Sequence, residues 1–190
     1  MYKTIFSKLL MMTMMVVVST TFTACGGDDD NSEDKGGIGD GTNSVLFINS
    51  TNYTLLPYAW FMNWGDGYGS FMIDNQNAIL KGIDQSSGYT YVAVRIPYTS
   101  GAIPTGTFTT TADLDFDINR IASTQKCDMT GWSMNLTMTI AKQGDKYIVD
   151  VTTDDLHIFK SYDETGDGQK GSLKIHYEGP LEIYGLSIGY

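Results

Sequence analysis

Residues 133–140 read SMNLTMTI, with apolar and polar side chains in strict alternation. Successive side chains of an extended strand point to opposite faces, so this pattern predicts a strand with one buried face. The segment KQGDK at 142–146 contains the turn residues Gly and Asp, and YIVDVTT at 147–153 resumes the alternation. The two alternating segments therefore predict a β-hairpin. The apolar row of the first strand consists of Met134, Leu136, Met138 and Ile140.

The same alternation continues on both sides of this hairpin. Downstream, SLKIHYEG at 172–179 follows a turn-forming segment, ETGDGQKG at 164–171. Upstream, SVLFINS at 44–50 and YTYVAVRIP at 89–97 are strand-like segments in a region punctuated by Gly, Pro, Asn and Ser. No long segment shows apolar residues at helical spacing.

Roughly nine or ten short strands with frequent turn signals predict an all-β fold, arranged as an antiparallel two-sheet β-sandwich. A lipocalin-like up-and-down β-barrel is the alternative, because the C-terminal hairpins follow one another along the chain.

The composition limits the classes of partner. The chain has 190 residues, with 12 Lys and Arg against 22 Asp and Glu, and a formal net charge of −10. An acidic protein repels phosphate backbones, so we expect no nucleic-acid partner. It also repels anionic lipid headgroups, so membrane attachment requires a hydrophobic or covalent anchor. Residues 44–190 are long enough for a single all-β domain with its own core.

The first 25 residues have the order of a secretory signal. Residues 1–8, MYKTIFSK, carry two lysines, and LLMMTMMVVV at 9–18 is an apolar run too short to span a membrane. Small and polar residues then lead to Cys25, in the sequence FTAC. FTAC resembles the lipobox of bacterial lipoproteins, although Phe22 stands where Leu is commonest. The resemblance implies that residues 1–24 are a cleaved signal peptide and that Cys25 carries fatty-acyl chains of the palmitate class.

An acidic cluster follows the cysteine. The segment CGGDDD places Asp28, Asp29 and Asp30 shortly after Cys25. It resembles the surface-export signal of Bacteroidota lipoproteins, which implies an outer-membrane, lipid-anchored protein that faces the cell exterior. Residues 25–43 are otherwise rich in Gly, Asp, Asn and Ser, so we expect a lipidated cysteine followed by a disordered acidic tether.

The positions of the cysteine and histidine residues in the sequence do not indicate a catalytic or metal centre. With Cys25 acylated, Cys127 has no partner for an intrachain disulfide, and no His lies near it in the sequence to activate it as a nucleophile. His157 and His176 lack the spacing of a zinc site and are interpreted as surface residues. We therefore expect no bound metal, no cofactor and no catalytic residue.

Three acids alternate with apolar residues in DLDFDI at 113–118. On a strand, Asp113, Asp115 and Asp117 share one face, where like charges repel one another. Ca²⁺ would relieve this repulsion, but strand geometry aims the carboxylates in parallel, so a solvated strand face is the favoured interpretation. The sequence leaves open whether these aspartates bind calcium.

The segment WFMNWGDGYGS at 60–70 is the candidate ligand site. Trp64 and Tyr68 flank a glycine-rich turn with Asp66 at its tip. Flat aromatic faces beside a carboxylate suit sugar binding, because the ring stacks on C–H groups and the acid accepts hydroxyl hydrogens. The competing interpretation is a hairpin whose aromatic residues belong to the core. Trp60 fits that interpretation, since it continues an apolar strand.

Three functions are compatible with these features. The favoured one is a surface-exposed, lipid-anchored binding module for a glycan or a partner protein, without enzyme activity. The first alternative is a small hydrolase with paired carboxylates drawn from Asp66, Asp113, Asp115 and Glu178. The second is a fimbrial or adhesin subunit, which needs a donated strand that the sequence does not reveal.

Overall fold

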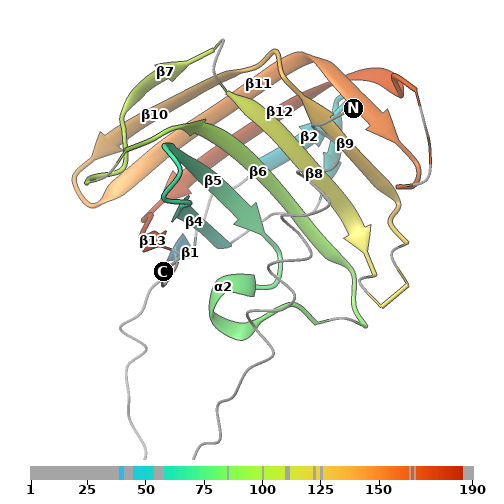
Figure 1. Ribbon diagram of the computed structural model, residues 1–190, viewed down its shortest axis with the longest axis horizontal. Helices are drawn as coiled ribbons and strands as arrows, with labels where there is room; N and C mark the ends of the chain where they lie inside the picture. Colours follow the sequence, from blue (N-terminus) through green and yellow to red (C-terminus); the bar gives the residue numbers. More distant parts are fainter. Residues whose placement is uncertain are drawn as a thin grey trace, which may run out of the picture. The chain divides into compact units, whose positions relative to one another are not determined.

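The structure, a computed structural model, describes residues 39–40, 45–53, 58–84, 86–99, 101–109, 112–121, 123–124, 126–162, 164 and 166–185. All of them lie in one compact unit, Gly37–Tyr190 (Figure 1). The predicted signal peptide of residues 1–24, Cys25 and the acidic residues 28–30 fall outside the described residues. The lipid anchor and the export signal therefore stay predictions.

Strands dominate the described residues, which confirms the all-β prediction. The helix among them, α2 (Ala78–Lys81), has only four residues. No helix in the described part of the chain is long and apolar enough to cross a membrane. The strands are β1 (Gly39–Asp40), β2 (Val45–Ile48), β3 (Thr51–Tyr53), β4 (Tyr58–Asn63), β5 (Tyr68–Asp74), β6 (Tyr89–Pro97), β7 (Gly106–Phe108), β8 (Asp113–Arg120), β9 (Met129–Ser133), β10 (Thr137–Gln143), β11 (Lys146–Phe159), β12 (Gln169–Gly179) and β13 (Ile183–Gly185).

Hydrogen bonds join these strands into one mixed sheet. Its main path runs β1-β4-β5-β6-β8-β9-β11-β12-β2-β3, while β10 pairs with β11 and β7, and β13 pairs with β4. The prediction of a purely antiparallel fold is wrong, because β13 runs parallel to β4 with Ile183 opposite Phe61. After β12 the chain passes Pro180, which has no amide hydrogen to extend the strand, and crosses to β4 instead of turning back.

Neither predicted architecture is confirmed in its finer form. The described strands form one connected sheet rather than two separate ones. Its path ends at β1 and β3, which do not pair with each other within the described residues, so the up-and-down barrel is not confirmed either.

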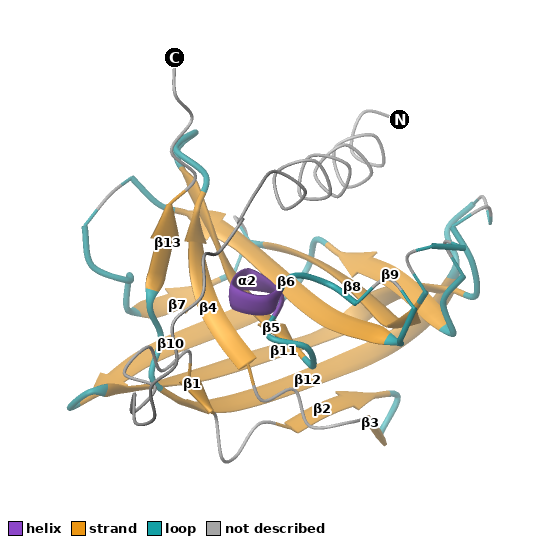
Figure 2. Ribbon diagram, turned by 90° about the horizontal axis from the view of Figure 1, so that it is seen from below, coloured by secondary structure: helices purple, strands orange, loops and turns teal. Residues whose placement is uncertain are grey.

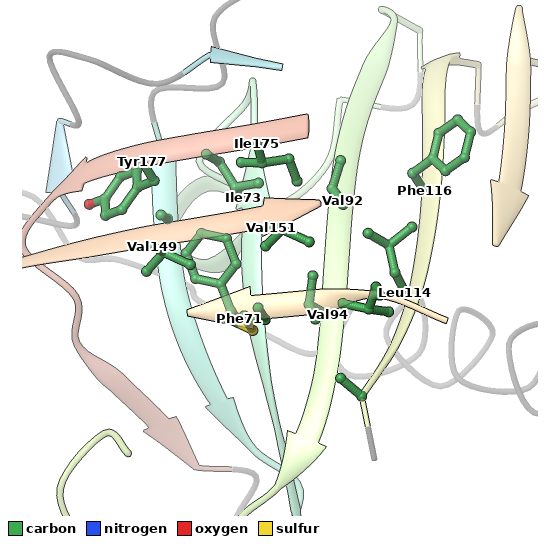
Figure 3. Close-up of a cluster of buried hydrophobic side chains, with 14 of the residues drawn as sticks. Phe71, Ile73, Val92, Val94, Leu114, Phe116, Val149, Val151, Ile175 and Tyr177 are labelled. Atoms are coloured by element: carbon green, nitrogen blue, oxygen red, sulfur yellow. The ribbon is translucent and has the colours of Figure 1, made fainter. Parts of the chain in front are cut away.

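The sheet is strongly curled, and its inner face encloses the hydrophobic core (Figure 2). Side chains from β5, β6 and β8 face side chains from β11 and β12 across this core (Figure 3). The rings of Phe71 and Tyr177 meet there with their centroids 5.8 Å apart, although their strands are distant along the sheet path. Full burial of one such side chain stabilises the fold by about 1.5–3 kcal/mol.

The predicted hairpin is formed by β10 and β11, but its first strand is shorter than expected. Residue Ser133 ends β9, and β10 begins only at Thr137. Met134 lies in the step between these strands and is 44% exposed, so its predicted place in the apolar row is wrong. β11 pairs with β10 along its first part and with β9 along its last part, and its register against β12 shifts between Thr153 and Leu156. β9 and β10 therefore part from each other beside this bulge.

We call the face of the sheet that points away from the core the outer face. Side chains at alternate positions of each strand point to it. Cross-strand pairing places one row of outer-face residues from β4 to β12, consisting of Trp60, Met72, Ala93, Asp115, Trp132, His157 and Lys170.

Candidate functional site

The predicted ligand segment forms the tip of the β4–β5 hairpin. Gly65 and Gly67 have φ values of 73° and 86°, a region that residues with a Cβ rarely adopt. The side-chain oxygen of Asn63 accepts a hydrogen bond from the Gly65 amide (3.0 Å), and Asp66 Oδ1 accepts one from the Tyr68 amide (3.2 Å). These bonds within the turn fix the positions of Asp66 and Tyr68.

Arg95 on β6 joins these two residues. Its Nη2 lies 2.8 Å from Asp66 Oδ2, and its guanidinium carbon lies 4.2 Å from the centroid of the Tyr68 ring. Tyr68 is still 40% exposed. The sequence alone did not single out Arg95, although it is the one basic residue in YTYVAVRIP and alternates with the valines that face the core.

Trp64 lies at the same hairpin tip but is only half-exposed. Its indole Nε1–H donates a hydrogen bond to Ser70 Oγ (2.9 Å), which fixes the ring against β5. Trp60, in contrast, is buried as expected, with 1% of its surface exposed. Of the predicted aromatic pair, Tyr68 is therefore the more accessible ring, and Trp64 supports the turn.

The three aspartates of β8 lie on one face, as the alternation predicts, but that face is not uniformly solvated. Asp113 is exposed and Asp115 is half-buried, whereas Asp117 is only 1% exposed. Tyr162, from the connection between β11 and β12, donates its hydroxyl hydrogen to Asp117, and Arg120 Nη1 lies 3.7 Å from the same carboxylate. A segment distant in sequence thus buries this end of the strand, which corrects the prediction of a solvated face.

Burial raises the pKa values of two carboxyl groups on this strand. It raises the pKa of Asp115 to about 7, with the charge of Asp117 as the second cause. Burial also raises the pKa of Asp117. Asp115 Oδ2 accepts a hydrogen bond from the Tyr91 hydroxyl (3.0 Å). No group of three or more His, Cys, Asp or Glu side chains in the described ranges could hold a metal ion, so nothing found there supports calcium.

Asp74 is a further buried carboxylate that the sequence did not single out. It accepts hydrogen bonds from the amides of Gln76 (2.7 Å), Asn77 (2.7 Å) and Ala78 (3.3 Å). Burial raises its pKa to about 6, and these bonds oppose the shift. Asp74 therefore organises the turn that leads into α2, and the acid-plus-asparagine composition of DNQN at 74–77 is the signal for such a turn.

The histidines and the cysteine do not assemble into a reactive centre. His157 is only 8% exposed, so its interpretation as a surface residue is wrong, while His176 is half-buried with its Nδ1 2.8 Å from Asp150 Oδ1. Cys127 is half-buried and forms no disulfide, and burial raises its pKa to about 11. A thiol with a raised pKa is rarely ionised at neutral pH and is a poor nucleophile.

The four carboxylates proposed for a hydrolase are not all brought together. Asp66 lies at the hairpin tip, and Asp113 and Asp115 lie on β8. Glu178 lies on β12, which faces β5 and β6 from the other side of the core, and its Oε1 is 3.4 Å from Lys146 Nζ. Glu178 is therefore separated from the other three, whereas Asp66 and Asp113 are both neighbours of Arg95, the first as its ion-pair partner and the second as its cross-strand partner.

No protein-family model, no curated protein and no solved structure matches this chain. Its function must therefore be inferred from the geometry of its own residues.

Proposed function

We propose that the chain is a lipid-anchored surface protein that binds its ligand at the tip of the β4–β5 hairpin. The observation that carries this proposal is the exposed Tyr68 ring, stacked on the Arg95 guanidinium beside Asp66. Tyrosine and arginine are among the side chains that most often dominate binding energy. Because the turn and the ion pair already hold them in place, little side-chain entropy is lost when a ligand binds.

A glycan is the favoured ligand class, with a partner protein as the alternative. Asp66 and Arg95 pair with each other, so the tip offers both hydrogen-bond donors and acceptors. Sugar hydroxyl groups both donate and accept, and sugar C–H groups pack against aromatic rings. A strongly charged ligand would first have to compete with the Asp66–Arg95 pair.

The proposed location rests on the N-terminal sequence. Several acyl chains on Cys25 would give stable attachment, since a single chain anchors only weakly. The acidic run at residues 28–30 would direct the protein to the outer surface. A flexible tether over residues 26–43 would hold the domain on the order of 25 Å from the lipid, which lets the hairpin tip meet ligands outside the membrane.

Glycan and protein arrays test the proposal when they are probed with the full-length protein in detergent micelles. Tyr68→Ala is probed in parallel, with Thr139→Val on β10 as a control outside the tip. We expect a signal on at least one glycan or protein that Tyr68→Ala loses and Thr139→Val keeps. A signal that Tyr68→Ala retains in full would contradict the hairpin tip as the binding site.

A carboxylate-dependent hydrolase is the second candidate, and one observation favours it. Asp115 is half-buried, and burial raises its pKa to about 7, a value suited to a general acid at neutral pH. Asp113 and Asp117 share its face of β8, and Asp117 is already engaged by Tyr162 and Arg120, so Asp113 is the candidate second carboxylate. Release of reducing sugar from array-positive glycans, abolished by Asp115→Asn, would support this candidate over the binding module.

A further inference from the structure

A hollow of about 370 Å³ opens where β9 and β10 part along β11. Its walls are polar apart from one leucine. Thr137 and Thr152, which are cross-strand partners on the outer face, lie on its two sides. Neither threonine hydroxyl forms a hydrogen bond with another described residue, so both are available to a ligand. The lining consists of Asn135, Leu136, Thr137, Thr152, Thr153, Asp154 and Asp155.

Buried hydrogen bonds make the walls of the hollow rigid. Thr153 Oγ1 donates to the Asn135 carbonyl oxygen (2.8 Å) and lies 2.9 Å from Ser133 Oγ. Thr153 Oγ1 also accepts a hydrogen bond from the Asp155 amide (3.0 Å). The bulge of β11 and the step between β9 and β10 are therefore tied to each other, and the hollow is formed before any ligand arrives.

An aromatic stack stands beside the hollow. The Trp132 and His157 rings lie parallel, with centroids 3.8 Å apart and an interplanar angle of 8°. Trp132 is 38% exposed although His157 covers one of its faces, so part of the indole remains open to solvent. Asp155 connects the stack to the hollow, because it lines the hollow and lies 3.9 Å from His157 Nε2.

Hydrogen bonds fix the orientation of the His157 ring. Its Nδ1 lies 2.6 Å from the Asp167 carbonyl oxygen, which can only accept, so Nδ1 carries the hydrogen. Its Nε2 lies 2.7 Å from Lys170 Nζ. The imidazole is therefore a fixed support for the Trp132 indole.

One of the two acids that line the hollow is paired with a lysine. Lys170 Nζ lies 2.5 Å from Asp155 Oδ1, and this contact lowers the pKa of Asp155, which is therefore ionised at neutral pH. Asp155 can still accept a hydroxyl hydrogen through its second oxygen. A neutral ligand rich in hydroxyl groups satisfies these walls without disturbing the ion pair, whereas an anion would meet Asp154 and Asp155.

From this geometry we infer that the hollow beside the Trp132–His157 stack is a second binding site, for a single neutral sugar ring or a similar cyclic polyol. Its volume falls near the lower end of the range for small-molecule sites. It is separate from the hairpin tip, since β5 and β9 are three strand spacings apart, about 14 Å. The inference therefore stands or falls independently of the proposed function of the tip.

Saturation-transfer NMR on the full-length protein in detergent micelles tests the inference. The probes are glucose, galactose, mannose, N-acetylglucosamine and myo-inositol, with glucuronate and glucosamine as charged counterparts. We expect at least one neutral probe to bind, and Trp132→Ala and Thr137→Val each to weaken its binding by about tenfold. Thr137→Val removes only a hydroxyl group and keeps the shape of the side chain, so it decides the question even if Trp132→Ala does not fold.

One control separates this site from the rest of the surface. Thr139→Val changes the next outer-face position of β10, which lies outside the hollow. It should bind the neutral probe within twofold of the unchanged protein. The inference is overturned if no neutral probe binds, if only the charged probes bind, or if Thr137→Val binds as tightly as the unchanged protein.

Discussion

Arg95 and Tyr68 are stacked, with the guanidinium carbon 4.2 Å from the ring centroid, although they lie on neighbouring strands rather than in one turn. The same guanidinium forms the ion pair with Asp66, so one residue of β6 contacts both Asp66 and Tyr68 at the β4–β5 tip. All three side chains remain partly exposed, and an exposed ion pair of this kind contributes only about 0–1 kcal/mol to stability. The arrangement therefore fits a role in ligand contact better than a role in holding the fold.

Tyr68 is exposed and Trp60 is buried, so we expect losses of stability of different size when each of these two aromatic residues of the same hairpin is truncated. Tyr68→Ala should lower the free energy of unfolding by no more than about 1 kcal/mol, because the ring is exposed. Trp60→Ala removes a buried ring and should cost about 3–5 kcal/mol. Urea titration of both variants, followed by circular dichroism, measures the difference. Equal losses of stability would mean that Tyr68 belongs to the packed structure.

Gly131 on β9 tests the pairing of β9 with β11. An added Cβ there would lie 2.2 Å from the His157 carbonyl oxygen and 2.6 Å from the Phe116 ring. Neither neighbour can move without disturbing the sheet, so Gly131→Ala should destabilise the fold by about 1–3 kcal/mol. Gly185→Ala is the matched control, because a Cβ at this strand glycine would meet nothing within 4 Å. Thermal melts of equal midpoint for the two variants would argue against the β9–β11 pairing.

Stability should fall as the pH rises from about 4 to 7. Burial raises the pKa of folded Asp115 from 3.8 to about 7 and that of Asp74 to about 6. In this window the folded carboxyls keep protons that the unfolded chain has released, so the native state binds more protons and loses stability with rising pH. The pKa values of Asp84 and Asp155 are lowered from 3.8. These two groups therefore change the pH dependence of stability only below about pH 4 and do not affect the range from 4 to 7.

The pH effect is measured as the difference in unfolding free energy between pH 5 and pH 7.5. Asp115→Asn should reduce this difference, because the amide has no proton to lose. A variant with the same pH dependence as the unchanged protein would show that Asp115 is not the group responsible.

Cys25 should carry the lipid. Metabolic labelling with an alkyne fatty acid is expected to mark the unchanged protein and to leave Cys25→Ser unlabelled, because the acyl chains attach to this sulfur and to the amine released by cleavage. Cys127→Ser serves as the control for the other cysteine and should be labelled normally. Label that persists in Cys25→Ser would contradict the lipobox interpretation.

Local patterns in the sequence were sufficient for the strands but not for how distant strands pair. The β10–β11 hairpin follows from alternation and a short turn, both of which are local. The parallel pairing of β13 with β4 joins segments far apart in the chain, and no local pattern encodes it. Met134 was misplaced for the same reason. The point at which β9 ends and β10 begins depends on which part of β11 pairs with each of them.

The residues of the candidate site also fall into two groups: those that a local pattern identifies and those that depend on contacts with distant segments. Asp66 and Tyr68 could be found because they flank a glycine-rich turn, whereas Arg95 required knowledge that β6 lies beside β5. Asp117 looked solvated in the sequence because nothing near it indicates that Tyr162, from a later connection, covers it. Residues that depend on long-range contacts are those that sequence patterns leave undetermined.

The dissociation constant of the array-selected ligand, measured by calorimetry for the unchanged protein, Tyr68→Ala and Thr139→Val, tests the central claim most directly. If the hairpin tip is the binding site, Tyr68→Ala should weaken binding by about 1–3 kcal/mol, the range for a dominant aromatic contact. Thr139→Val should leave the dissociation constant within twofold. An unchanged constant for Tyr68→Ala, in a variant whose melting curve shows it to be folded, would contradict the account.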